Sequence, residues 1–133
     1  MSHFPVITVG FCPAWDVTCR ADDVDWGQHV RVLQIACPAG KALNVSKALA
    51  WMGQKSIAAG LWGRNDWPAA EELPAELQSR IDFRLTFVPG RTRRNITVID
   101  THRQREMHLR APCRLATKAA LTQLGEDLKA LVG

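Results

Sequence analysis

The sequence contains no tyrosine, and aromatic residues make up only 7% of its 133 residues. No apolar run approaches the roughly 20 residues needed to cross a bilayer, and no basic segment precedes an apolar stretch at the N-terminus. We therefore expect a cytoplasmic protein with no membrane partner. Internal repeats and low-complexity segments are also missing from the sequence, and its 47% hydrophobic content is ordinary for a globular protein. A chain of this length is expected to form one domain with its own core.

The cysteines and histidines have no metal-ligand spacing. The cysteine count of four is even, but no pair has the Cys-x-x-Cys spacing of a zinc site. Because no export signal is recognisable, we expect reduced thiols rather than disulfides, and no structural metal. The cysteines are Cys12, Cys19, Cys37 and Cys113, and the histidines are His3, His29, His102 and His108.

The net charge of +4 comes mainly from arginines between residues 91 and 110. Such a cluster is compatible with nucleic acid or with the phosphate of a small molecule, because a guanidinium matches phosphate oxygens in a two-point contact. Residues 91–110 contain no aromatic side chain to stack on bases, so we expect no nucleic-acid partner. For any single arginine the alternative is a solvated basic surface. The arginines are Arg91, Arg93, Arg94, Arg103, Arg105 and Arg110.

Hydrophobic periodicity predicts an α/β fold in which strands alternate with helices. Residues 17–35 alternate imperfectly, which predicts two or three short strands with a turn at 26–28, in a small sheet separate from the main one. The other expected strands are 6–10, 55–63, 81–88, 96–100 and 106–109. A first helix is expected to begin after the loop 38–42, with Asn44 and Ser46 in its first turn, and to stop at Gly53. A second spans 69–79 with an interruption at Pro74, and a third begins after a Thr117 N-cap.

The stretch from Cys37 to Gly53 combines small residues with the start of an amphipathic helix. A helix start presents unpaired backbone N–H groups and the positive end of the helix dipole, which favour an anion. The alternative is an ordinary strand-to-helix connection. Asp16 lies just beyond the first expected strand, where ligands collect in open α/β sheets, although a turn or capping aspartate is the commoner role.

Three segments resemble the PfkB, or ribokinase-like, family of carbohydrate kinases, in its 1-phosphofructokinase and tagatose-6-phosphate kinase branch. Cys12-Pro13-Ala14-Trp15-Asp16 is similar to the Asn-Pro-Ala-Leu-Asp of that family. Residues 39–53 resemble its Gly-Gly-Lys-Gly-Ile-Asn helix start, and residues 90–96 resemble its Gly-x-Thr-Arg-x-Asn segment before a central strand. The three segments follow the family order and are spread over most of the length of the chain.

The resemblance implies the N-terminal part of a ribokinase-like, doubly wound α/β sheet with a small inserted β lid. Residues 1–133 would form a single truncated sugar-kinase domain, and residues 17–35 would supply the lid. In the family the lid covers the sugar and often pairs with its copy, so we expect a homodimer through the lid or an exposed sheet edge. ATP and Mg²⁺ serve the intact family member, and we expect this chain alone to bind neither.

The resemblance also implies substrate-binding roles for individual residues. Asp16 would hold sugar hydroxyls, Gly40 and Lys41 would shape and charge the sugar-phosphate site, Asn44 would hydrogen-bond the sugar, Arg93 would meet its phosphate, and Asn95 is a further candidate that orients the turn. Two family glycines are replaced by Ala39 and Ala42. Either alanine would be strained if its backbone needed a positive φ angle.

The function implied is the sugar-binding part of an ATP-dependent sugar-phosphate kinase, which in its intact form would phosphorylate a phosphorylated hexose such as fructose 1-phosphate. The Gly-Ala-Gly-Asp motif that carries the catalytic aspartate in the family does not occur in this sequence. We therefore expect no catalytic residue in this chain and no phosphoryl transfer by it alone. The alternative is a non-catalytic sugar-phosphate-binding or dimerisation module.

Overall fold

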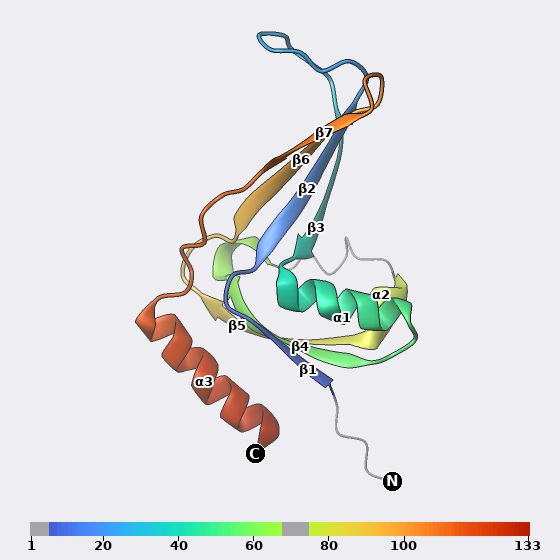
Figure 1. Cartoon of the computed structure of the whole chain (residues 1–133). Helices are drawn as coiled ribbons and strands as arrows, with labels where there is room; N and C mark the ends of the chain where they lie inside the picture. Colours follow the sequence, from blue (N-terminus) through green and yellow to red (C-terminus); the bar gives the residue numbers. More distant parts are fainter. Residues whose placement is uncertain (1–5, 68–74) are drawn as a thin grey trace.

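The computed structural model describes residues 6–67 and 75–133, whose strands form two sheets (Figure 1). One sheet has the strand order β1-β4-β5, and the other has the order β3-β2-β6-β7. The strands are β1 (Val6–Gly10), β2 (Ala14–Ala21), β3 (Leu33–Ala39), β4 (Ser56–Gly63), β5 (Ile81–Val88), β6 (Arg93–Asp100) and β7 (Arg105–Leu109). The helices are α1 (Lys41–Trp51), α2 (Ala75–Arg80) and α3 (Lys118–Val132), and Arg64–Asp66 forms a 3₁₀ helix, η1.

The first sheet is parallel, with α1 and α3 on its opposite faces (Figure 1). This arrangement confirms the expected α/β class, in which helices cover both faces of a parallel sheet. β1 and β4 approach closely where Gly10 pairs with Gly60. A Cβ atom at Gly60 would lie 2.4 Å from the Gly10 carbonyl oxygen, so only glycine fits this position.

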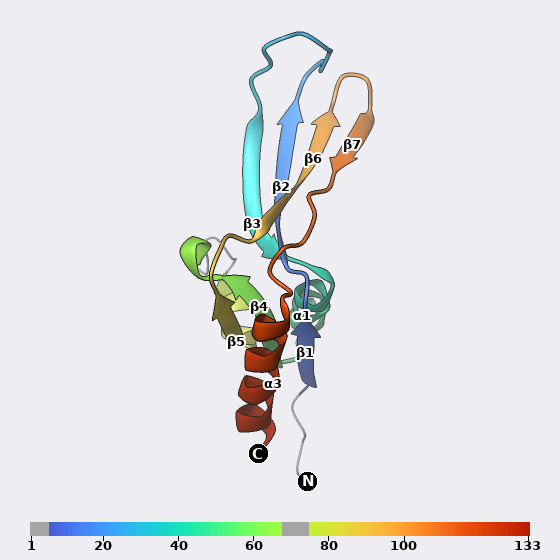
Figure 2. The same cartoon turned by 90° about the vertical axis from the view of Figure 1, so that its left-hand side faces the viewer.

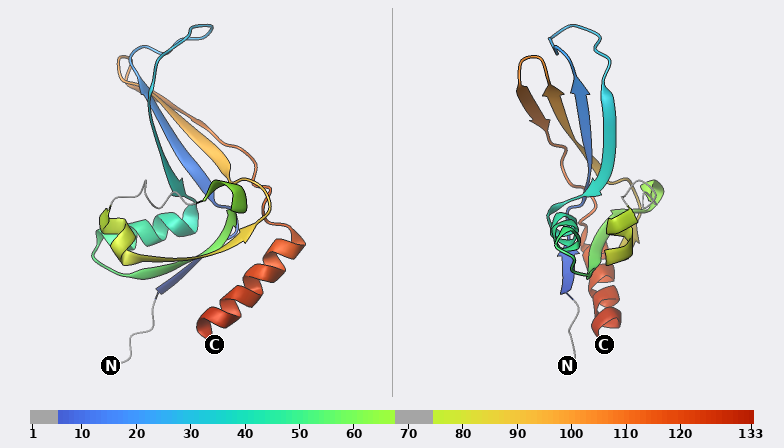
Figure 3. Two further views of the ribbon diagram at one scale, coloured as in Figure 1. Left: turned by 180° about the vertical axis from the view of Figure 1, so that it is seen from behind. Right: turned by 90° about the vertical axis from the view of Figure 1, so that its right-hand side faces the viewer.

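The second sheet extends away from the first as a separate blade (Figure 2). Its two central strands, β2 and β6, run parallel to each other, and the edge strands β3 and β7 pair with them antiparallel. β2 begins only a short turn after β1 ends, so the chain passes directly from one sheet into the other. Figure 3 shows the C-terminus at the opposite end of the molecule from the tips of this blade.

The second sheet differs in extent from the one expected at residues 17–35. Residues 22–32 connect β2 to β3 without forming a strand, whereas Ala14–Asp16 and Ala36–Ala39 belong to the sheet. β6 begins at Arg93 instead of 96, because Ala14 and Arg93 already pair at the start of the β2–β6 ladder. The resemblance had implied a central strand there. Alternation along one strand does not reveal which sheet the strand joins, and β6 joins the blade.

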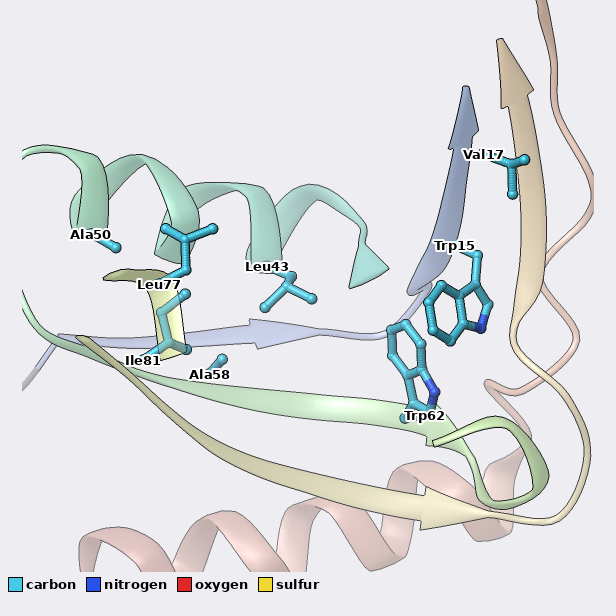
Figure 4. Close-up of a cluster of buried hydrophobic side chains, with 8 residues drawn as sticks. All are labelled: Trp15, Val17, Leu43, Ala50, Ala58, Trp62, Leu77 and Ile81. Atoms are coloured by element: carbon cyan, nitrogen blue, oxygen red, sulfur yellow. The ribbon is translucent and has the colours of Figure 1, made fainter. Parts of the chain in front are cut away.

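The main core lies between α1 and the first sheet and continues to the base of the second (Figure 4). Trp15 of β2 and Trp62 of β4 meet edge to face with ring centroids 5.5 Å apart, which joins the two sheets. A buried trio of hydroxyls fixes α1 on the sheet. Ser46 of α1 lies 2.8 Å from the Thr8 hydroxyl and accepts a hydrogen bond from Ser56 at 2.9 Å.

α3 covers the other face of the first sheet, where Leu61, Val88, Leu115, Ala120 and Leu124 form a second core cluster. The expected Thr117 N-cap is confirmed, since its hydroxyl accepts a hydrogen bond from the Ala120 N–H. Leu121 of the same helix lies off this cluster and is 40% exposed.

The expected helix at 69–79 is described only from Ala75 onward, and its Pro74 interruption lies outside the described residues. The strands expected at 55–63, 81–88 and 106–109 appear as β4, β5 and β7 with bounds that differ by at most one residue. None of the helices within residues 6–67 and 75–133 is both long enough and apolar enough to cross a membrane.

Candidate functional site

A cavity of about 830 Å³ lies where the two sheets and the start of α1 meet. Its walls come from the end of β1, one face of β2 and β6, and the first turn of α1. All the substrate-binding residues expected from the sequence line it, although they come from separate segments of the chain. They are Asp16, Gly40, Lys41, Asn44, Arg93 and Asn95.

The start of α1 has the form that an anion site requires. Gly40 is the N-cap residue, no side chain caps the helix, and its first turn contains no acidic residue. The first intrahelical bond runs from the Asn44 N–H to the Gly40 carbonyl at 2.8 Å, which leaves the preceding N–H groups without an intrahelical partner. Lys41 adds a positive charge at the same end. These donors and the helix dipole all favour an anion.

Gly40 is the position in this loop that requires glycine. Its φ angle is 116°, which side-chain-bearing residues rarely adopt, and a Cβ atom there would lie 3.1 Å from the Pro13 Cα atom. Ala39 and Ala42 are not strained, because the non-glycine residues with positive φ are Asp23 and Gln104 in the part of the chain that the structure describes. The replacement of the two family glycines therefore leaves the loop conformation intact.

Asp16 presents an uncommitted carboxylate to the cavity. Its side chain is half-buried, and within the described ranges it has neither a hydrogen-bond partner nor an ion-pair partner. Asn95 lies beside it, since the two residues pair in the β2–β6 ladder. A free carboxylate can accept hydrogen bonds from two hydroxyls. This is the role that the family resemblance implies for Asp16.

Arg93 and Asn95 hold neighbouring segments of the chain in place. The Arg93 guanidinium donates to the carbonyls of Pro13 (3.2 Å), Ala111 (3.0 Å) and Cys12 (3.2 Å). The Asn95 Oδ1 atom accepts from the Ala111 N–H at 3.1 Å, which fits the turn-orienting role considered for this residue. Together these bonds tie the turn after β1 to the segment that follows β7.

Two thiols lie at the same junction. Cys113 Sγ is 3.7 Å from the carbonyl oxygen of Phe11, and the Cys113 thiol contacts that of Cys12. The hydrogen bond of the Cys12 thiol to Cys113 raises the pKa of Cys12, because it favours the protonated thiol. Burial adds to the increase, while the charge of Arg93 opposes it. All four cysteines are free thiols, as expected.

The cavity also has polar residues to which the sequence gave no role. Thr18 and Thr97 pair in the β2–β6 ladder, and His108 faces Thr97 from β7. Thr97 could have been found by extending the alternation of Arg93 and Asn95 by one step, because every second residue of a strand shares a face. His108 gave no comparable signal, since its position depends on the register of β7. Arg110, a member of the arginine cluster considered for phosphate, also lines the cavity.

A second charged group has a structural role at the far end of the blade. Asp100 is 2% exposed, and its carboxylate accepts from the N–H groups of Asp23, Val24 and Arg103 and from the Arg105 side chain. These bonds, led by that from the Arg103 N–H, lower the pKa of Asp100 to about 2 although burial opposes them. The charged carboxylate therefore fastens the two loops at the tip of the blade.

The chemistry available in the cavity is recognition of a small polar anion. Lys41, Arg93 and Arg110 supply positive charge, and Asp16 supplies the carboxylate. Among residues 6–67 and 75–133, no group of three or more His, Cys, Asp and Glu side chains is placed to hold a metal ion.

No protein-family model and no curated protein matches the sequence. Solved structures do match the fold. A protein described as a possible 1-phosphofructokinase from Thermotoga maritima has a TM-score of 0.78 and 26% identity over 97% of this chain. Phosphofructokinase-2 from Escherichia coli in complex with fructose-6-phosphate has a TM-score of 0.76 and 16% identity over 96% of it, and ribokinase from Giardia lamblia has a TM-score of 0.69 and 17% identity over 98%.

The chain spans 42% of the length of each of these three structures. The two likenesses below 20% identity establish the fold alone. The three structural matches, the parallel sheet and its projecting blade show that this chain resembles the PfkB, ribokinase-like carbohydrate kinases. The chain corresponds to the N-terminal part of their fold.

Proposed function

We propose that this chain supplies the sugar-phosphate-binding part of an ATP-dependent sugar-phosphate kinase. The observation that carries the proposal is the convergence of all six expected substrate residues on one cavity at the uncapped start of α1. The phosphate of the substrate would lie against the α1 N–H groups and Lys41, and its hydroxyls would face Asp16 and Asn44. Fructose phosphates are the substrate class that the comparison with phosphofructokinases favours.

ATP and Mg²⁺ belong to this proposal only through the intact kinase. The resemblance assigns the nucleotide site and the catalytic aspartate to a part of the fold that these 133 residues do not include. Phosphoryl transfer depends on positioning and on neutralising the charge of the transferred group. The chain by itself is therefore proposed to bind substrate without phosphorylating it, and a coupled assay for ADP release checks this directly.

Binding is tested by following the melting temperature while fructose 1-phosphate is added. A ligand that binds only the folded state stabilises it by about 2.7 kcal/mol at 100 times its dissociation constant, so the melting temperature should rise with concentration. Lys41→Met removes the charge beside the α1 start and should weaken this rise. Lys55→Met is the matched control, because Lys55 is also exposed but does not line the cavity. The absence of any rise in the wild-type chain would contradict the proposal.

A dimerisation module is the second candidate, and the blade favours it. The edge strand β3 and the loop before it expose Trp26 (87%), Leu33 (67%) and Ile35 (64%) to solvent. One similar structure is a tetrameric inhibited form of phosphofructokinase-2, so oligomers occur on this fold. Sedimentation of the wild-type chain and of Ile35→Glu tests the candidate. A concentration-dependent dimer that the substitution abolishes would support it, and a wild-type monomer would exclude it.

A further inference from the structure

Thr97 and His108 form a hydrogen-bonded pair on the cavity wall, in positions to which the sequence gave no role. Thr97 of β6 lies directly opposite His108 of β7 in the antiparallel ladder, and both line the cavity. The Thr97 Oγ1 atom is 3.1 Å from His108 Nδ1, and His108 Nε2 is 3.2 Å from Glu106 Oε1. The three side chains therefore make a short chain of contacts that ends at the cavity.

In the neutral imidazole, these contacts determine the direction of both hydrogen bonds. A carboxylate oxygen only accepts, so the Glu106 contact places the proton of the neutral imidazole on Nε2. Nδ1 then carries a lone pair, and the Thr97 hydroxyl must donate to it. With its proton engaged, the Thr97 oxygen presents only lone pairs to the cavity. Thr97 is thus set to accept a hydrogen bond from a ligand.

Thr97 adds a hydrogen-bond acceptor beside Asp16. Thr97 lies two positions along β6 from Asn95, which pairs with Asp16, so Thr97 and the Asp16 carboxylate share one face of the blade. Both can accept a hydrogen bond from a hydroxyl group. At the start of α1 the backbone N–H groups and the Lys41 ammonium are donors, and the Asn44 amide can both donate and accept. A ligand with hydroxyl groups near Thr97 and Asp16 and an anion near the α1 start satisfies both sets of residues.

We propose that Thr97 determines the specificity of this cavity by accepting a hydrogen bond from a sugar hydroxyl, with His108 and Glu106 as the residues that orient it. The ligand class is a polyhydroxylated phosphate monoester, which the cavity would distinguish from inorganic phosphate by its hydroxyls. This inference rests on the proposed function, since it describes the hydroxyl end of the same site whose anion end is the α1 start.

The first experiment separates the two ends of the cavity. Thr97→Val keeps the shape of the side chain and its preference for strands but removes the hydroxyl. It should bind fructose 1-phosphate roughly three- to tenfold more weakly, the range expected for one lost neutral hydrogen bond. Its affinity for inorganic phosphate should not change. Thr97→Ser should bind like the wild type, and Thr122→Val is the control on the exposed surface of α3.

The second experiment tests the orienting role of His108. Fructose 1-phosphates in which one hydroxyl at a time is replaced by fluorine cannot donate at that position. One of them should bind the wild type more weakly than the parent sugar phosphate, because the Thr97 oxygen can only accept. His108→Ala frees the Thr97 proton to donate, so the difference between that analogue and the parent should shrink. A merely structural role for His108 would lower both affinities together and leave their ratio unchanged.

The outcomes distinguish this inference from the proposal on which it rests. If the wild-type chain does not bind fructose 1-phosphate, both are wrong. If it binds and Lys41→Met weakens that binding but Thr97→Val does not, the proposed function stands and the inference is overturned. Equal loss of affinity for fructose 1-phosphate and inorganic phosphate in Thr97→Val would also overturn it, because the effect would then not concern the hydroxyl end.

Discussion

Replacing Gly40 with alanine should destabilise the protein more than replacement at any open left-handed glycine. The φ angle of 116° and ψ angle of 160° at Gly40 lie in a region that is almost restricted to glycine, which costs a side-chain-bearing residue about 1–3 kcal/mol. A Cβ atom there would also lie 3.1 Å from the Pro13 Cα and 3.4 Å from the Cys12 carbonyl oxygen. These are backbone atoms, so relieving the contact requires the turn itself to move, at a further cost of about 1–3 kcal/mol.

The expected loss for Gly40→Ala is therefore about 3 kcal/mol, which corresponds to a fall in melting temperature of roughly 10 °C for a domain of this size. Gly53→Ala is the matched control. Gly53 has a φ angle of 83°, but nothing lies within 4 Å of its ideal Cβ position. Only the backbone conformation is penalised there, at about 1 kcal/mol.

Urea unfolding of the wild type and the two variants measures the loss of unfolding free energy for each substitution. The losses can be compared directly if the slope of the free energy against urea concentration is the same in all three proteins. A Gly40→Ala variant that loses no more stability than Gly53→Ala would refute the reasoning, because it would show that the turn after β1 does not press on the start of α1. A larger loss of unfolding free energy in Gly40→Ala would agree with close packing of the turn after β1 against the start of α1.

Three further predictions concern charge and thiol chemistry. The pKa of Asp100 is lowered to about 2, so its charged form stabilises the fold above the ordinary carboxyl pKa, and this stabilisation is lost as the pH falls towards 2. The urea midpoint should therefore fall between pH 5 and 2, and the fall should be smaller in Asp100→Asn, which has no carboxyl group at this position. The raised pKa of Cys12 should slow its alkylation by iodoacetamide at pH 8, and Cys113→Ala, which removes the hydrogen-bond acceptor, should accelerate it; peptide mass spectrometry can follow both rates, and equal rates would contradict the thiol contact. Arg93→Ala removes three charge-assisted bonds to carbonyls and should lower the unfolding free energy by about 3 kcal/mol in a urea titration, whereas a loss below about 0.5 kcal/mol would contradict its structural role.

Local sequence patterns predicted most of the individual elements. The β-branched run at 6–10 and the alternation at 81–88 have the bounds of β1 and β5, because strand formation there depends on local composition and on one buried face. The first helix and its end before Gly53 were also predicted, since Gly53 adopts the positive φ angle of a helix C-terminus, although the helix begins at Lys41, within the expected loop.

The partition of the strands between two sheets was not predictable in the same way. β2 and β6 pair over their whole lengths, although the first residues of the two strands, Ala14 and Arg93, are far apart in the sequence. No periodicity within either strand specifies that pairing, so the blade was expected at residues 17–35 alone. Thr97 and His108 were not predicted as cavity residues for the same reason. Their place at the cavity depends on the β6–β7 register and on the pairing of β6 with β2, which local periodicity does not specify.

The structural role of Arg93 is compatible with the phosphate contact proposed for it. A guanidinium has five N–H donors, and the carbonyls of Cys12, Pro13 and Ala111 engage three of them. Two donors remain on a side chain that lines the cavity and whose orientation is already fixed. Because the carbonyls hold the guanidinium in place, a substrate phosphate would meet these donors without the entropic cost of ordering a long side chain. The bonds from Arg93 to the three carbonyls would therefore also preorganise the anion end of the site. Variants of Arg93 should lose both folding stability and phosphate affinity, whereas Lys41→Met should lose phosphate affinity alone.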